Sequence, residues 1–142
     1  TGAKAIVETL VGDHNPAGSL PVSFPQDSNR IPCYYTLLPN NTEVMFEGNR
    51  RAKYPFGFGL SYTTFEYSDV KVSSDKIKDT DTVTVSFKIK NTGAVDGAEV
   101  AQIYVNDVES TIYRPVKELR AFKKVFLKAG EETEELKRIY GK

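Results

Sequence analysis

The alternation of apolar and polar residues in the second half of the chain limits its possible folds more than any other feature. In residues 83–90 every second residue, from Val83 to Ile89, is apolar. A period of two residues places these side chains on one face of a β-strand. Turn signals such as residues 91–93 (Asn-Thr-Gly) separate further segments of this kind. We therefore predict four or five short strands, whereas a complete β-sandwich has about seven.

The other strand predictions differ in clarity. A first strand with one irregularity is indicated by Phe65, Tyr67, Val70 and Val72. Residues 100–105 are apolar on both faces, which favours a central strand, and residues 119–127 continue the pattern. The last dozen residues show no alternation, so a frayed helix and a strand both stay open.

The first part of the chain has a different pattern. An amphipathic helix of about three turns, ending at Gly12, is predicted from the helical spacing of Ala3, Ile6, Val7, Leu10 and Val11. Its apolar stripe needs a partner, and no other segment is an obvious one. Residues 15–25 are rich in Pro and Gly and indicate an extended segment. We interpret residues 26–53, which lack a regular pattern, as a linker lying on a surface.

Residues 54–63 (YPFGFGLSYT) form the predicted joint between these two parts. Pro55 fixes φ at about −65°. Gly57 and Gly59 are free to adopt positive φ or to allow close backbone approach. The aromatic rings between them are expected to wedge into apolar surface. We predict a structural joint, without an acid, base or metal ligand, that consists of Tyr54, Pro55, Phe56, Gly57, Phe58, Gly59 and Tyr62.

Four blocks carry a resemblance to a known family: residues 13–25 (DHNPAGSLPVSFP), 54–63, 97–105 (GAEVAQIYV) and 114–122 (RPVKELRAF). In this order the chain resembles, over about residues 1–131, the C-terminal part of a glycoside hydrolase family 3 enzyme of the β-glucosidase type. The resemblance implies a mainly β chain with an incomplete fibronectin type III-like (immunoglobulin-like) β-sandwich. One helix and an extended linker, left over from an α/β sandwich domain, would precede it. The implied divisions are residues 1–25 (remnant), 26–63 (linker with the joint) and 64–142 (fibronectin-like domain, truncated at its C-terminus).

The resemblance also implies a function. The parent enzyme would hydrolyse terminal, non-reducing β-linked glucose or a similar sugar with retention. In the family the nucleophile and the acid/base lie in domains that precede this region, so we expect a non-catalytic accessory part without a cofactor. Its partners would be the catalytic domains of the same polypeptide, with carbohydrate bound only through the parent, and relatives are often periplasmic or secreted. The alternative is a carbohydrate- or protein-binding fibronectin-like module.

Composition argues against other partners. Nineteen basic and nineteen acidic residues cancel, so neither a nucleic acid nor an anionic membrane surface is indicated. The longest apolar run is far below the roughly 20 residues of a membrane span. Cys33 is the single cysteine, which excludes an internal disulfide, and we interpret it as a structural thiol.

Five carboxylates are candidates for a catalytic pair: Asp13, Glu43, Glu47, Asp107 and Glu109. A retaining glycosidase needs two carboxyl groups about 5–5.5 Å apart, one with a raised pKa. None of the five lies in a motif that combines a strand end with an apolar pocket, so we interpret them as surface, cap or turn residues. His14 lacks both a nucleophile elbow and a second metal ligand.

Two features have alternative interpretations. One is an aromatic set that would serve either as a carbohydrate platform or, as we favour, in packing between domains: Tyr34, Tyr35, Tyr54, Phe56, Phe58 and Tyr62. The other is the loop at residues 106–115, where we predict an ion pair between Arg114 and either Asp107 or Glu109.

Overall fold

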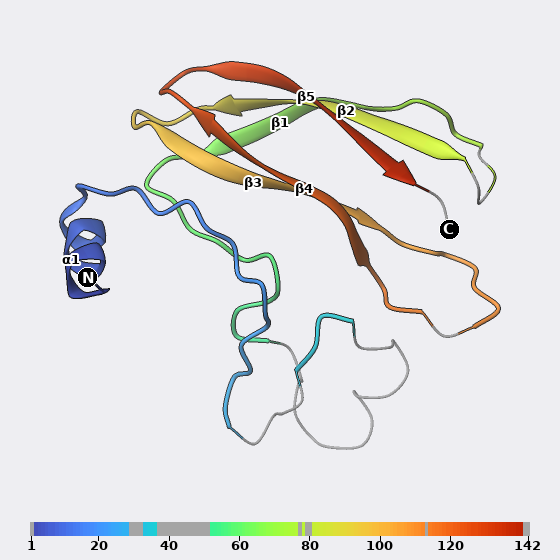
Figure 1. Cartoon of the computed structure of the whole chain (residues 1–142), viewed down its shortest axis with the longest axis horizontal. Coiled ribbons are helices and arrows are strands. Elements are labelled where there is room, and N and C mark those ends of the chain that lie inside the picture. Colours follow the sequence, from blue (N-terminus) through green and yellow to red (C-terminus); the bar gives the residue numbers. More distant parts are fainter. Residues whose placement is uncertain are drawn as a thin grey trace. The chain divides into compact units, whose positions relative to one another are not determined.

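The computed structural model describes residues 2–28, 33–36, 52–76, 78, 81–112 and 114–140. These residues form one helix and five strands, which confirms a mainly β fold (Figure 1). In chain order the elements are α1 (Gly2–Val11), β1 (Phe65–Val72), β2 (Thr82–Asn91), β3 (Gly97–Val105), β4 (Glu118–Leu127) and β5 (Glu132–Tyr140). Most of the predicted linker, including Glu43 and Glu47, lies outside the described residues.

The chain divides into two compact units. The first consists of Thr1–Gly18, Leu60–Ala101 and Ala121–Lys142, and the second of Ser19–Gly59 and Gln102–Arg120. The predicted joint therefore belongs to both units, with the division between Gly59 and Leu60.

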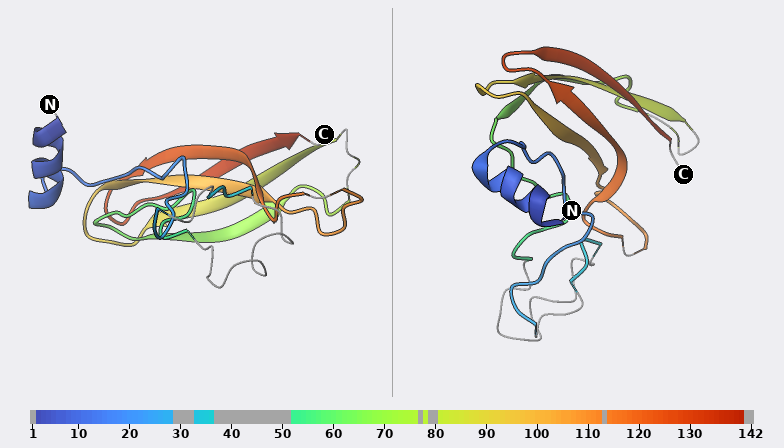
Figure 2. Two further views of the ribbon diagram at one scale, coloured as in Figure 1. Left: turned by 90° about the horizontal axis from the view of Figure 1, so that it is seen from below. Right: turned by 60° about the vertical axis from the view of Figure 1, so that its left-hand side comes forward.

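A three-stranded antiparallel sheet, in the order β1-β2-β5, lies in the first unit. β2 and β5 run side by side along their lengths, from the Thr82–Tyr140 pair to the Lys90–Glu132 pair (Figure 2). The irregularity predicted in β1 is confirmed as a register shift between Ser68 and Lys71. Asp69, within this bulge, has a φ of 51°, a conformation that Asp tolerates better than most residues.

β3 and β4 form a second, two-stranded sheet. The prediction that β3 is a central strand was wrong, because β4 is its only sheet neighbour in the described part of the chain. Apolar residues on both faces of a strand indicate contacts above and below the sheet, and they do not require a neighbouring strand at both edges. Ala98 and Ala101, which point to opposite faces, are 7% and 2% exposed.

The core of the first unit lies between the two sheets. Ile89 of β2 packs with Val125 and Leu127 of β4, and Phe65 lies against this cluster. Ile89 and Leu127 are 0% and 2% exposed. Burying one such aliphatic side chain contributes about 1.5–3 kcal/mol, so these few residues supply much of the stability of the unit.

The C-terminal segment is a strand, which decides between the two alternatives left open by the sequence. Its inward-facing residues include Glu135, which is 8% exposed and forms an ion pair with Lys123. Because polar residues occupy inward positions of β5, the alternation that marks a half-buried strand is absent from its sequence.

Helix α1 begins and ends as predicted, with Gly12 in the left-handed region at a φ of 90°. None of its residues is buried, and its apolar residues Ile6, Val7, Leu10 and Val11 are 55–76% exposed. Among the described residues, no helix has the length and apolar character needed to span a membrane.

Candidate functional site

In the second unit, the joint pairs with the extended Pro/Gly-rich segment that precedes it in sequence. Phe24 and Tyr54 form an antiparallel bridge, in which the Phe24 amide donates a 2.8 Å hydrogen bond to the Tyr54 carbonyl oxygen. The Leu20 amide donates to the Phe58 carbonyl oxygen, and the Gly57 amide donates to the Leu20 carbonyl oxygen, each at 2.8 Å. Two distant sequence segments are therefore held together by their backbones.

Gly57 is the bend of this arrangement, and two side chains of β3 hold it. Its φ is 82°, which favours glycine. Gln102 Nε2 donates a 3.2 Å hydrogen bond to the Gly57 carbonyl oxygen, and the Tyr104 hydroxyl donates to Gln102 Oε1. A Cβ atom at Gly57 would lie 2.7 Å from the Tyr104 hydroxyl oxygen. Neither the backbone conformation nor the surrounding space thus accepts a side chain.

The aromatic rings of the second unit pack mainly on one another. Tyr35 stacks on Phe56 with ring centroids 4.1 Å apart, and Tyr54 lies 5.3 Å from Phe58. This pairing supports packing over an open sugar platform for these four rings. Tyr34 is 62% exposed, more than Tyr62 at 51% and Tyr54 at 41%, and is therefore the most accessible member of the set.

Tyr104 lies within the same unit under the ammonium group of Lys117, whose Nζ is 4.8 Å from the ring centroid. Burial raises the pKa of the Tyr104 hydroxyl, and Tyr35 raises it further when it is ionised. The hydroxyl therefore stays protonated and keeps its donor role toward Gln102.

In the first unit, Asn15 ties the segment after α1 to the start of the β-rich region. Its Nδ2 donates a 2.9 Å hydrogen bond to the Asp96 carbonyl oxygen. Its Oδ1 accepts hydrogen bonds from Ser61 Oγ at 2.9 Å and from the Tyr62 amide at 2.8 Å. The Tyr62 hydroxyl in turn donates a 2.6 Å hydrogen bond to the carbonyl oxygen of Thr9 in α1. Tyr62 is thus a hydrogen-bonded anchor for the helix, with its ring 51% exposed.

Asn91 forms a second polar junction in this unit and is 0% exposed. Its Oδ1 accepts from the Thr63 hydroxyl at 2.5 Å and from the Gly93 amide at 3.1 Å. Its Nδ2 donates to the carbonyl oxygens of Val95, at 2.9 Å, and Leu127, at 3.2 Å. A buried amide with partners on both ends fixes the end of β2 against the end of β4.

The residues of the predicted ion pair lie close together in the second unit. Arg114 Nε is 3.4 Å from Asp107 Oδ2, and Arg114 Nη1 is 4.0 Å from Glu118 Oε1. Arg114 Nε is buried and has no hydrogen-bond partner among the described residues. The contact with Asp107 is therefore electrostatic rather than a well-formed hydrogen bond.

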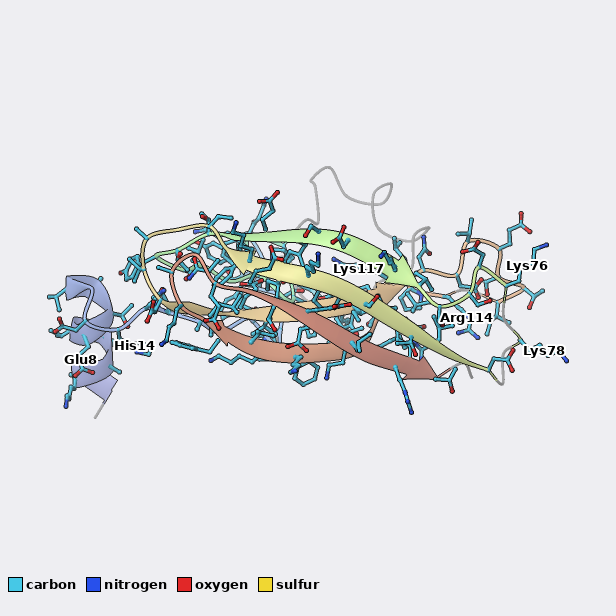
Figure 3. The ribbon with its side chains drawn as sticks, turned by 90° about the horizontal axis from the view of Figure 1, so that it is seen from above. Glu8, His14, Lys76, Lys78, Arg114 and Lys117 are labelled. Atoms are coloured by element: carbon cyan, nitrogen blue, oxygen red, sulfur yellow. The ribbon has the colours of Figure 1, made fainter. Side chains whose placement is uncertain are left out.

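The three described carboxylates of the candidate catalytic set are divided between the two units. Asp13 is an exposed residue of the first unit, whereas Asp107 and the exposed Glu109 belong to the second. His14 follows α1, where its amide donates a 3.0 Å hydrogen bond to the Glu8 carbonyl oxygen (Figure 3). In the part of the chain that the structure describes, no group of three His, Cys, Asp or Glu side chains is placed to hold a metal ion.

Sequence reasoning missed the side chains that hold the joint. Asn15 lies in a block that the resemblance singled out as a segment, without a role for its amide. Gln102 and Tyr104 are outward-facing residues of β3, and the presence of a polar Gln among apolar neighbours was the only available signal.

Comparisons with known proteins agree with this architecture. Residues 1–62 match a family model described as the glycosyl hydrolase family 3 C-terminal domain, and residues 99–135 match one described as a fibronectin type III-like domain. The chain is 45% identical over 141 residues to the periplasmic beta-glucosidase of Salmonella typhimurium. The chain corresponds to the C-terminal region of glycoside hydrolase family 3 enzymes.

Other relatives support the same assignment for this family 3 region. The thermostable beta-glucosidase B of Acetivibrio thermocellus is 41% identical over 140 residues. A beta-glucosidase structure from Erythrobacter marinus matches 99% of this chain with a TM-score of 0.89 and 35% identity. One from Listeria innocua, in complex with glucose, matches 95% with a TM-score of 0.81 and 38% identity.

The family 3 region spans about a fifth of the length of these proteins: 18% of both curated relatives, and 19% and 20% of the two structures. The alignments cover 92% and 90% of this chain. The predicted family resemblance and the fibronectin-like fold are thereby confirmed.

Proposed function

We propose that this chain is a non-catalytic accessory region that braces the catalytic domains of a family 3 glycosidase. The single observation that carries the proposal is the exposed apolar stripe of α1. Tyr62 anchors the helix to the β-rich unit by a hydrogen bond to Thr9, while the apolar stripe of the helix is left uncovered. A ten-residue helix is marginal in water by itself, so an uncovered stripe indicates a partner surface. We assign that surface to an α/β sandwich domain of the parent polypeptide.

The proposed reaction of the parent is hydrolysis of a terminal, non-reducing β-linked glucose or xylose with retention. The relatives with this region are named β-glucosidases or β-xylosidases. A retaining mechanism requires a nucleophilic carboxylate and an acid/base carboxyl group about 5–5.5 Å apart. We place both outside this chain, so this region would contribute to activity by stabilising the domains that carry them.

The test compares the full-length gene product with this chain, using p-nitrophenyl β-glucoside and p-nitrophenyl β-xyloside. The full-length protein is expected to hydrolyse at least one of them, and the purified chain neither. In the full-length protein, Asp13→Asn, Asp107→Asn and Glu109→Gln should each leave kcat within a few-fold of the original. Loss of an acid/base group lowers the rate by at least about a hundredfold. Such a loss in any of the three variants would overturn the non-catalytic assignment.

A second candidate function is a carbohydrate-binding module, which the 62% exposure of Tyr34 favours. Tyr34 precedes Tyr35 of the stacked Tyr35–Phe56 pair in sequence, and an exposed ring offers a face for a pyranose. This candidate predicts saturable binding of the purified chain to insoluble glucan, lost in Tyr34→Ala. The bracing role predicts no such binding.

A further inference from the structure

The two sheets present different outer faces within the first unit. On β4, the side chains of Lys123, Val125 and Leu127 face β5 and the core. Strand alternation then places Phe122, Lys124 and Phe126 on the opposite, outer face. Phe122 is 65% exposed and Phe126 is 64% exposed. We call these three residues the β4 outer face.

The outer face of the three-stranded sheet is charged. Phe87 and Ile89 point into the core, so Lys88 and Lys90 point outward. Lys88 Nζ is 2.6 Å from Asp69 Oδ2. Opposite charges also face each other across neighbouring strands in the register pairs Glu66–Lys90, Lys90–Glu132 and Lys88–Glu134. Complementary charges of this kind are typical of a sheet face in contact with water.

The contrast between the faces identifies the β4 outer face as the one shaped for contact. Each phenylalanine there leaves about two-thirds of its surface in water, and covering such a ring with protein is favourable because it removes apolar surface from water. Phe122 and Phe126 lie about 13 Å apart along the strand, at about 3.3 Å per residue, with the cationic Lys124 between them. A complementary surface would have two apolar pockets with a carboxylate between them.

We propose that the β4 outer face docks onto another domain of the same polypeptide, at a surface separate from the one that receives α1. This inference rests on the proposed function, because it takes its partner from the parent enzyme. The relatives have about four-fifths of their length outside the region that matches this chain, which supplies the candidate partner. The cationic Lys124 between the two rings calls for a carboxylate, which a neutral glucan lacks, so a protein partner accounts for the face better than a glucan chain does.

The test uses Phe122→Thr/Phe126→Thr, a double variant that retains β propensity. The matched control is Leu136→Thr, because Leu136 is also 64% exposed but lies on the outer face of the other sheet. In the full-length gene product, the double variant should lower the Tm by about 2 °C or more, and the control should leave it unchanged. In this chain alone, both should have the same small effect. The proposal would be overturned if the double variant and the control had the same Tm in the full-length protein. It would also be overturned if the double variant lowered the Tm of this chain alone by as much as it lowered that of the full-length protein.

Two further measurements complete the test. Lys124→Glu reverses the central charge without removing either ring, and it should also lower the Tm of the full-length protein only. Binding to insoluble glucan that the double variant abolishes, with no change in Tm, would contradict a protein partner. The proposed function would fail if the full-length protein hydrolysed neither nitrophenyl glycoside. The docking proposal would still be decided, because it depends only on the Tm values of the double variant and its control.

Discussion

Lys123 Nζ on β4 donates a 2.6 Å hydrogen bond to Glu135 Oε2 on β5, and this ion pair links the two sheets within the first unit. The Glu135 side chain is 10% exposed and the Lys123 side chain 46%. The carboxylate is therefore the partner that depends on the contact, since the ammonium group retains water.

Removal of the ammonium group should leave Glu135 buried and unpaired. We expect Lys123→Met to destabilise the chain by about 1–3 kcal/mol, the usual cost of an unsatisfied buried polar group. The double variant Lys123→Met/Glu135→Leu should recover most of the loss, because no charge is then buried alone. Urea unfolding of the three proteins measures both effects. A single variant as stable as the original would show that solvent already satisfies Glu135.

A second polar contact between the sheets makes stability depend on pH. Burial raises the pKa of the Glu99 carboxyl group on β3, and the 3.4 Å hydrogen bond from the Tyr67 hydroxyl lowers it by less. The folded state thus holds this proton more tightly than the unfolded state. The contribution is fully present below the unfolded pKa of about 4.3 and is lost as the pH rises through the folded pKa.

Glu99→Gln should therefore be more stable than the original chain at neutral pH and should lack this loss on raising the pH. Tyr67→Phe removes the hydrogen bond that lowers the pKa, so the loss should move to higher pH. Urea unfolding at intervals between about pH 4 and pH 8 follows both variants, across the range in which a raised Glu pKa falls. If all three curves ran parallel, Glu99 would have the same pKa in the folded and unfolded chains.

Alanine substitutions at Gly57 and Gly130 distinguish the cost of backbone strain from the cost of steric crowding. Both glycines have positive φ, 82° and 77°, but a Cβ at Gly130 would meet no atom within 4 Å. Gly130→Ala should cost about 1–2 kcal/mol, the strain of a left-handed alanine. Gly57→Ala should cost more, because its Cβ would overlap Gln102 and approach the Tyr104 hydroxyl. Thermal unfolding of the two variants compares them, and losses of equal size would mean that Gln102 does not hold this loop.

The strands were predictable from the sequence where one face of the strand is buried and the other is exposed to solvent. β2 meets this condition, as does the helix with its terminal Gly12. β5 does not, because the inward Glu135 is stabilised by a residue of another sheet that no local pattern reveals. The central position predicted for β3 was wrong for a related reason. Apolar residues on both faces of a strand reflect packing above and below the sheet, and they do not reveal how many strands lie beside it.

The candidate site was predictable as a segment but not as a set of contacts. Proline and glycine marked residues 54–63 as a bend. The side-chain amides of Asn15, Asn91 and Gln102 bond to residues far away in the sequence. These contacts span 36 positions for Asn91–Leu127, 45 for Gln102–Gly57 and 81 for Asn15–Asp96. Such contacts depend on tertiary structure. The proposed parent activity came from the family resemblance alone, because no motif in this sequence predicted a pair of catalytic carboxylates.

The bracing role of α1 is the central claim, and one substitution in the full-length gene product tests it most directly. Leu10→Asp places a charge on the stripe at a residue that is 76% exposed. The control, Ala5→Asp, introduces the same charge at an exposed helix residue outside the stripe. The measurement is the temperature at which hydrolysis of p-nitrophenyl β-glucoside is irreversibly lost. We predict a lower temperature for Leu10→Asp and no change for Ala5→Asp, and identical temperatures for both variants and the original would contradict the account.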